Sequence, residues 1–243
     1  FAGGYIVLLL KKIFSFLPKS VESMLPVLIL PLLGIIIMGL FMCAINPAVG
    51  AVNQWITDGL NSMGETSKII LGCIVAGMMA IDMGGPINKA AYVYGVTVLS
   101  TAAITTGGFD IMAAVMIGGM VPPIAIALCA TFFKKKWTAT ELKSAPVNYI
   151  MGLCFITEGA IPYAAADPVR VIPSCVAGSA VAGGLSMAFG CTLRALHGGI
   201  FVFPVVGNVM FYVIALIAGA LVGMALLALL KKNISTQESR QSA

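Results

Sequence analysis

The stretch that decides the fold class is IMAAVMIGGMVPPIAIALCATFF, residues 111–133, which holds no charged residue and is followed at once by KKKW, residues 134–137. About 20 consecutive apolar residues are enough for a helix to cross the hydrocarbon core of a bilayer. Lysines clustered directly after such a run are typical of cytoplasmic loops. We therefore predict a transmembrane helix here, interrupted at Pro122–Pro123, with its lysine-rich end in the cytoplasm.

The composition extends this prediction to the whole chain. Of its 243 residues 60% are hydrophobic and only 9% are charged, whereas soluble domains carry about 25% charged residues. A chain this apolar has too few polar groups to cover a surface that faces water. The net charge of +5 lies in lysine clusters at the ends of apolar runs, so we expect no nucleic acid partner. The predicted fold class is an all-α integral membrane protein, a polytopic helical bundle.

Further apolar runs follow the same logic. Three are long enough to span a bilayer, the last of them kinked near residues 204–208: Met24–Ile45, Val171–Leu193 and Ile200–Leu230. Ala90–Phe109 is also apolar, while Ile69–Ile81 and Ser144–Thr157 are short for complete spans. Asn46–Ser67 is more polar, and we expect an interfacial loop or helix there, anchored by Trp55. The lysines near the C-terminus favour a cytoplasmic C-terminus.

Three segments combine polar groups with glycine and proline: DMGGPINK at 82–89, TEGAIPYAAADPVR at 157–170 and RALHGG at 194–199. The first two follow the short apolar runs, so they predict broken helices and re-entrant hairpins inside the membrane. Such discontinuous helices indicate the binding site of a transporter. The alternatives are an ordinary cytoplasmic turn for the first, a carboxylate in bulk water for the second and a structural histidine for the third.

The side chains in these segments suit a polyhydroxylated solute. The carboxylate of Glu158 can accept two hydroxyl hydrogen bonds, and Asn88 offers both donors and an acceptor. His197 is the only histidine of the chain, and an imidazole can donate, accept and act as a base near neutral pH. Gly198 allows close backbone approach. The six cysteines form no CxxC pair, so we expect no metal site, disulfide or cofactor.

The segments DMGGPINKAAY, MVPP, FITEGAIPYAAADPVRVIP and CTLRALHGGIF resemble the IIC domain of fructose-class permeases of the bacterial phosphoenolpyruvate-dependent phosphotransferase system. The resemblance runs from about residue 1 to 232. It implies a domain that binds sugar outside and carries it across by an elevator-like movement against a dimeric scaffold. It also implies that a phosphocysteine of a IIB domain, charged by a histidine of a IIA domain, phosphorylates the sugar, giving fructose 1-phosphate from fructose.

The resemblance also implies roles for individual residues. Glu158 matches the family's sugar-binding carboxylate, and His197 matches the histidine that meets the reacting hydroxyl, so these two are the predicted catalytic residues. Leu196 departs from the family pattern, which has proline before HGG. The predicted substrate-binding residues are Asn88, Lys89, Thr157, Glu158, His197 and Gly198.

The same resemblance predicts the organisation of the chain. Residues 1–67 would be the end of a scaffold or dimerisation part with an interfacial segment, 68–232 the sugar-binding transport domain and 233–243 a disordered polar tail. The opening FAGGYIVLLLKK lacks an initiator Met, so we expect upstream helices that this chain does not include. No cysteine lies in a polar loop suited to a phosphocysteine, so this segment alone should not phosphorylate sugar, and activity should require IIA and IIB domains or subunits. The expected setting is a homodimer in the bacterial inner membrane that takes fructose or a related hexose or hexitol.

Two other functions are compatible with the residues. A proton or sodium symporter would use Glu158 and His197 as coupling groups and would accumulate unmodified sugar. An intramembrane enzyme acting on lipid-borne substrates would need a nucleophile or a metal near His197, and the sequence offers neither.

Overall fold

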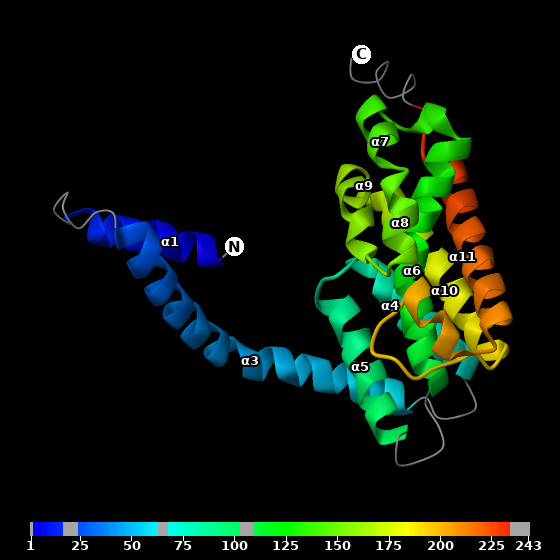
Figure 1. Ribbon diagram of the computed structural model, residues 1–243, viewed down its shortest axis with the longest axis horizontal. Helices are drawn as coiled ribbons and strands as arrows, with labels where there is room; N and C mark the ends of the chain where they lie inside the picture. The colour runs from blue at the N-terminus through cyan, green and yellow to red at the C-terminus, as the bar shows by residue number, and fades with distance from the viewer. Residues whose placement is uncertain (1, 17–23, 63–67, 103–108, 234–243) are drawn as a thin grey trace. The chain divides into compact units, whose positions relative to one another are not determined.

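The computed structural model describes residues 2–16, 24–62, 68–102 and 109–233, and it divides the chain into two compact units, 1–58 and 59–243 (Figure 1). The boundary between the units, after residue 58, lies inside helix α3 (Leu30–Ser62), whereas the predicted scaffold part ends at residue 67. The roles assigned to the parts remain predictions. Most of the predicted tail, 234–243, lies outside the described residues.

The first unit consists of helices with an apolar surface. It contains α1 (Ala2–Ile13), the short η1 (Phe14–Phe16), the π-helical turn η2 (Leu25–Ile29) and most of α3 (Leu30–Ser62). No side chain along Leu25–Ala51 is buried, and Val27 is 78% and Ile35 73% exposed. Such a surface is stable in lipid or against a partner and not in water. Of the two forms predicted for the interfacial segment, loop or helix, residues 46–62 adopt the helix, while 63–67 lie outside the described part.

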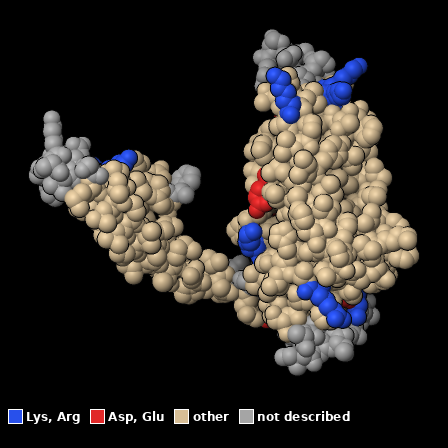
Figure 2. All heavy atoms as spheres, viewed as in Figure 1, with Lys and Arg blue, Asp and Glu red and all other residues tan. Residues whose placement is uncertain are grey.

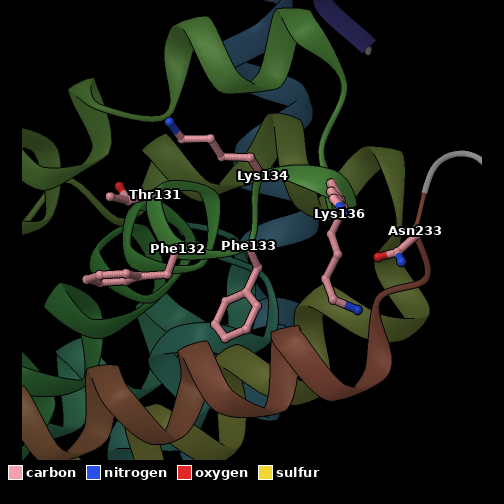
Figure 3. Close-up of a pocket in the computed structure, with 7 residues that line it drawn as sticks. Thr131, Phe132, Phe133, Lys134, Lys136 and Asn233 are labelled. Atoms are coloured by element: carbon pink, nitrogen blue, oxygen red, sulfur yellow. The ribbon is translucent and has the colours of Figure 1, made fainter.

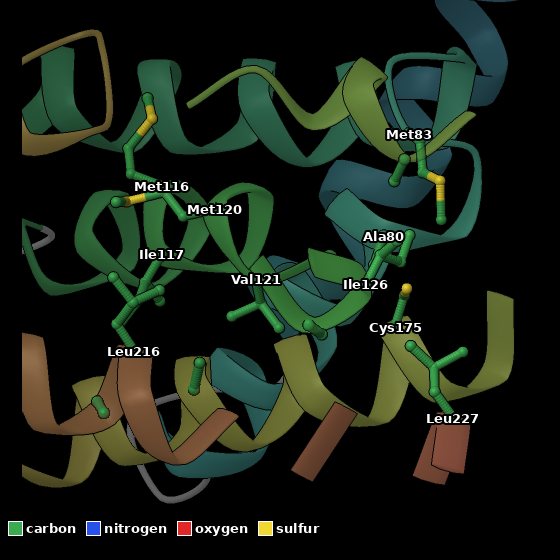
Figure 4. Close-up of a cluster of buried hydrophobic side chains, with 14 of the residues drawn as sticks. Ala80, Met83, Met116, Ile117, Met120, Val121, Ile126, Cys175, Leu216 and Leu227 are labelled. Carbon is green, nitrogen blue, oxygen red and sulfur yellow. The ribbon is translucent and has the colours of Figure 1, made fainter. Parts of the chain in front are cut away.

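The second unit is built around α6 (Phe109–Phe132), most of whose residues are buried. It is surrounded by α4 (Lys68–Ile81), α10 (Pro168–Ala188), α11 (Val209–Leu230) and α5 (Pro86–Ala102). Figure 4 shows the side chains that fill this core, among them Met116, Ile117 and Met120 of α6 with Leu216 of α11. A helix that is apolar on every side is expected at the centre of a bundle.

Small residues let the helices approach closely. A Cβ added to Gly118 of α6 would lie 2.6 Å from the Cα of Ala76 in α4, and one added to Gly178 of α10 would lie 2.7 Å from the carbonyl oxygen of Gly219 in α11. In membranes, where lipid tails are as apolar as the side chains, helices associate largely through such close packing.

The predicted interruption of α6 at Pro122–Pro123 is wrong, because the helix continues through both prolines. Proline has no N–H, so the carbonyl groups four residues earlier, those of Gly118 and Gly119, lose their helical donors. Two side-chain hydroxyls replace them: Ser179 Oγ donates to Gly118 O and Thr157 Oγ1 donates to Gly119 O, both at 2.8 Å. Hydroxyl side chains commonly satisfy backbone groups that proline frees in membrane helices.

Two predicted spans end differently from the expectation. Helix α10 stops at Ala188, and the run 200–230 is broken rather than kinked, into η6 (Ile200–Val205), strand β2 (Val206–Gly207) and α11. Strand β1 (Thr192–Leu193) pairs antiparallel with β2. Asn208 takes a left-handed φ of 58° before α11, and its amide donates to the carbonyl oxygens of Phe189 and Gly190. These hydrogen bonds hold the 192–207 loop against the end of α10.

The segment between α6 and α10 contains only short helices. They are η4 (Lys134–Lys136), α7 (Ala139–Ser144), α8 (Val147–Leu153), η5 (Thr157–Ala160) and α9 (Ile161–Ala166). A helix of seven residues is about 10 Å long, against about 30 Å for the hydrocarbon core. Residues 147–166 therefore form a hairpin of helices too short to cross the hydrocarbon core, and α8 and η5 pack on α6.

The surface agrees with a membrane setting. Figure 2 shows broad areas without charged groups, with lysine and arginine gathered at a few places. In the described part of the chain, four helices are long and apolar enough to cross a membrane: Leu25–Ala51, Phe109–Phe132, Pro168–Ala188 and Val209–Leu230. The predicted class, a polytopic helical membrane protein with broken helices, is confirmed.

Candidate functional site: three interrupted segments that meet

The first interrupted segment is the break between α4 and α5. Met83 and Gly84 have positive φ angles of 48° and 120°, which reverse the chain. The carboxylate of Asp82 accepts the backbone N–H groups of Ile87 at 2.6 Å and Asn88 at 2.9 Å, which caps the start of α5. The Asn88 amide donates to Met79 O at 2.8 Å, at the end of α4. Asn88 is 4% exposed and thus braces the break, whereas Lys89 is exposed.

The second segment is the tip of the α8–α9 hairpin. Thr157 is buried and anchored to Gly119 O of α6, while the neighbouring Glu158 is exposed. The Glu158 side chain lies against the first break, because a Cβ added to Gly84 would be 2.8 Å from its Oε1 and 3.2 Å from its Cγ. Two polar segments far apart in the sequence are therefore in contact, and Gly84 is required for that contact.

The third segment is the loop 194–199. The side chain of His197 is exposed, and its Nδ1 lies 2.6 Å from the carbonyl oxygen of Gly198. Its ring meets the ring of Phe155, at the hairpin tip, with centroids 5.6 Å apart at 66°. The Tyr92 hydroxyl of α5 donates to Leu196 O at 2.9 Å. The loop that carries the histidine is thus held by both the hairpin and α5.

Buried glycines make room for this arrangement. Gly199 has a φ of 92°, and a Cβ there would lie 2.6 Å from Leu153 O at the end of α8. Gly198 is buried, and a Cβ there would lie 2.6 Å from Cδ2 of Phe155. The loop and the hairpin are therefore in backbone-level contact, which only glycine permits at these positions.

The charged residues predicted for the site, Glu158 and Lys89, have no ionic partner within the described residues. Both ion pairs found there are made by Asp167, with Arg170 and Lys231. Glu158, His197 and Lys89 are all exposed, so they are available to a solute. No group of three histidine, cysteine, aspartate or glutamate side chains that could hold a metal ion exists among the described residues.

Two hollows are formed by described residues, one at the C-terminal end of α6 and one next to the first break. A hollow of about 370 Å³ is lined by residues 131–136 and Asn233 at the C-terminal end of α6, where Phe133 and Lys136 flank it (Figure 3). A smaller apolar one of about 280 Å³ is lined by Asp82, Met83 and residues of α9 and α10. Glu158 and His197 line neither of these two hollows.

Sequence reasoning missed several residues that shape the site. Gly84 and Phe155 provide the contacts between segments, and Tyr92 fixes the histidine loop. The sequence did contain one indication of how the hairpin tip is held. Pro123 has no N–H, so the carbonyl of Gly119 lacks its helical donor, and a side-chain hydroxyl is expected to donate to it. No local pattern indicated that Thr157 would supply it.

The fold and the site together define a class of protein. Helices interrupted by glycine and proline, with polar groups gathered where the interruptions meet, are the arrangement of a membrane transport protein.

Comparison with known proteins gives the family. Residues 1–178 match the family described as "Phosphotransferase system, EIIC". The chain belongs to this family and is a membrane component of a sugar phosphotransferase system. No solved structure matches it significantly.

Curated relatives agree with this assignment. The chain is 47% identical to the "PTS system fructose-specific EIIABC component" of Bacillus subtilis over 96% of its own length and 36% of the relative's. It is 47% identical to the "Fructose permease IIC component" of Bacillus amyloliquefaciens, over 96% of the chain and 75% of the relative. A third, the "PTS system fructose-specific EIIB'BC component" of Rhodobacter capsulatus, is 47% identical over 93% of the chain and 39% of the relative. The chain thus spans little more than a third of the first and third of these proteins.

Proposed function

We propose that this chain is the sugar-translocating IIC part of a fructose-type permease, which binds fructose or a related hexose or hexitol outside and presents it to a IIB phosphocysteine. The observation that carries the proposal is the meeting of three interrupted segments, with Glu158 against Gly84 and His197 against Phe155. The names of the relatives support fructose as the substrate and IIA and IIB domains as partners.

Each site residue has a role in this proposal. Glu158 accepts hydrogen bonds from sugar hydroxyls. A carbonyl oxygen can only accept, so the contact between His197 Nδ1 and Gly198 O places the proton of the neutral ring on Nδ1. Nε2 is then the basic nitrogen and accepts the proton of the reacting hydroxyl. The hydroxyl oxygen bonds to phosphorus, the S–P bond breaks, and the IIB cysteine leaves as a thiolate.

The remaining predicted binding residues divide into two kinds. Lys89, exposed beside the first break, and the backbone of Gly198 contact the sugar or its incoming phosphoryl group. Asn88 and Thr157 act through the segments they hold, because their side chains already donate to Met79 O and Gly119 O. In-line positioning of sugar and phosphocysteine supplies most of the rate enhancement.

The proposal includes the organisation of the protein. Residues 1–67 belong to the scaffold of a homodimer, and residues 68–232 form the moving transport domain. The lysine-rich end of α6 and the C-terminus face the cytoplasm of a bacterial cell, where the IIA and IIB domains operate. The exposed apolar side chains of both units contact lipid or the second subunit.

The test is uptake by membrane vesicles that contain the full-length protein, supplied with IIA, IIB and their phosphate donor. Labelled hexoses and hexitols are offered singly, and the product is analysed for phosphate. We expect phosphorylated fructose, and we expect Glu158→Gln and His197→Ala each to reduce its formation about 10³-fold with unchanged amounts of folded protein. Wild-type rates in either variant would remove that residue from the site. Accumulation of unmodified sugar with an ion gradient alone would replace the proposal by a symporter.

A further inference from the structure

Phe155 is an aromatic residue in an unusual backbone conformation at the tip of the α8–α9 hairpin. Its φ is 62°, in the left-handed region that a bulky side chain rarely adopts. A residue stays in that conformation only where its surroundings determine it, and such residues concentrate at functional sites. The surroundings of Phe155 are therefore informative.

The Phe155 ring occupies a slot between two glycines from different segments. A Cβ on Gly119 of α6 would lie 2.5 Å from Cε2 of the ring, and one on Gly198 of the histidine loop would lie 2.6 Å from Cδ2. Any side chain at either position would collide with the ring. The slot therefore requires glycine on both sides, one on the rigid core helix and one next to His197.

The same tip is fixed to the core by a second contact. Thr157, two residues after Phe155, donates to Gly119 O at 2.8 Å. This carbonyl has no helical donor, because residue 123 is proline and has no N–H. The hairpin tip is therefore attached to one turn of α6 by a hydrogen bond and a ring contact together. The Phe155 ring also contacts the His197 imidazole, and the centroids of these two rings are 5.6 Å apart.

We propose that Phe155 is a positioning residue that sets the orientation of the His197 imidazole relative to Glu158. The ring supports one side of the imidazole while Gly198 O holds Nδ1, which together direct Nε2 to one place. Phe155 and Glu158 belong to the same hairpin tip. The contact of Phe155 with His197 therefore fixes the position of the imidazole relative to the Glu158 carboxylate. This inference rests on the function proposed above and adds a residue to its site.

The test compares Phe155→Ala with Phe155→Tyr, which keeps the ring, in the full-length permease with IIA and IIB. For Phe155→Ala we expect kcat for fructose phosphorylation to fall about 100-fold, with KM changed less than about threefold because Glu158 remains. Phe155→Tyr should restore most of kcat. Phe189→Ala is the matched control, since Phe189 is another partly buried ring, paired with Phe211 at 5.1 Å. It should leave kcat within about threefold of wild type.

A spectroscopic measurement separates positioning from general packing. In protein labelled with ¹⁵N-histidine, the signal absent from His197→Ala identifies this imidazole. We expect a neutral ring protonated at Nδ1 in the wild type and a mixture of tautomers in Phe155→Ala. An unchanged tautomer together with wild-type kcat, or an equal loss of kcat in Phe155→Ala and Phe189→Ala, would overturn the inference. If Phe155→Ala is active while His197→Ala is inactive, only this inference fails; if His197→Ala is active, the proposed site itself fails.

Discussion

Two groups of charged residues in the second unit differ in whether their charges are paired. In the first, Asp167 at the start of α10 pairs with Arg170 at 2.9 Å and with Lys231 at 3.8 Å, and the Lys231 ammonium lies 4.4 Å from the centre of the Trp137 ring. The side chains of Asp167 and Lys231 are 10% and 7% exposed. In the second, Glu158 and Lys89 are exposed and have no ionic partner within the described residues.

The difference separates structural charges from functional ones. A buried charge is costly unless it is paired, so Asp167 and Lys231 stabilise each other and join the start of α10 to the end of α11. Charges placed among membrane helices without a partner are retained for a substrate. For these residues of the second unit, the pairing of the charge, and not its presence in an apolar chain, therefore indicates the role.

The largest effect on stability is expected from breaking the paired group. Asp167→Asn leaves Lys231 buried beside a neutral side chain, which should reduce the free energy of unfolding by about 3–5 kcal/mol. The measurement is thermal unfolding of the solubilised protein. Replacing both partners, in Asp167→Asn with Lys231→Met, should recover most of the loss because no unpaired charge remains. Asp58→Asn, at an exposed carboxylate in the first unit, is the control. Equal melting of wild type and Asp167→Asn would contradict the assignment.

The next effect concerns the unpaired group. Gly84→Ala places a Cβ where Glu158 lies, at a φ of 120° that L side chains rarely adopt. We expect sugar phosphorylation to fall about 100-fold, the scale of a misplaced site group. Gly77→Ala in the preceding helix is the matched control, since its Cβ would lie 3.6 Å from the nearest atom. Full activity of Gly84→Ala would show that the contact between the two segments is dispensable.

A smaller effect is expected at the attachment of the hairpin tip. Thr157→Val removes the hydroxyl that donates to Gly119 O, and Pro123 supplies no replacement. Leaving that carbonyl without a donor should cost about 1–2 kcal/mol and lower uptake about tenfold through displacement of the tip. Thr157→Ser keeps the donor and should behave as wild type. Identical stability of the Val and Ser variants would exclude the hydrogen bond as an anchor.

The smallest effect is expected for Trp137→Phe in the paired group. The Trp137 Nε1 is buried without a hydrogen-bond partner of normal geometry among the described atoms, so removing it should cost little. Phenylalanine keeps an aromatic face for Lys231. Stability should change by less than about 1 kcal/mol. A loss as large as that of Asp167→Asn would mean that features of the indole that phenylalanine lacks, its larger ring or its Nε1–H, stabilise the surroundings of the buried lysine.

Much of the fold followed from local patterns. The uncharged run 111–133 predicted α6, and the short runs before DMGGPINK and TEGAIP predicted the break at 82–85 and the hairpin 147–166. The same reasoning failed at Pro122–Pro123, where hydroxyls from other segments restore the helix, and at 200–208, where Asn208 bonds to the end of α10. Both errors have one cause, which is that hydrogen-bond partners distant in sequence decided a local conformation.

By itself, the sequence determined that this protein resides in a membrane, that its helices break at 82–85 and within 147–166, and which few residues carry polar chemistry, because apolar run length and glycine placement act locally. Only the tertiary structure decided which charges are paired, that Gly84 receives Glu158 and that Phe155 lies between Gly119 and Gly198. The physical reason is that contacts between segments depend on close packing of the whole bundle, and no window of the chain contains both sides of such a contact.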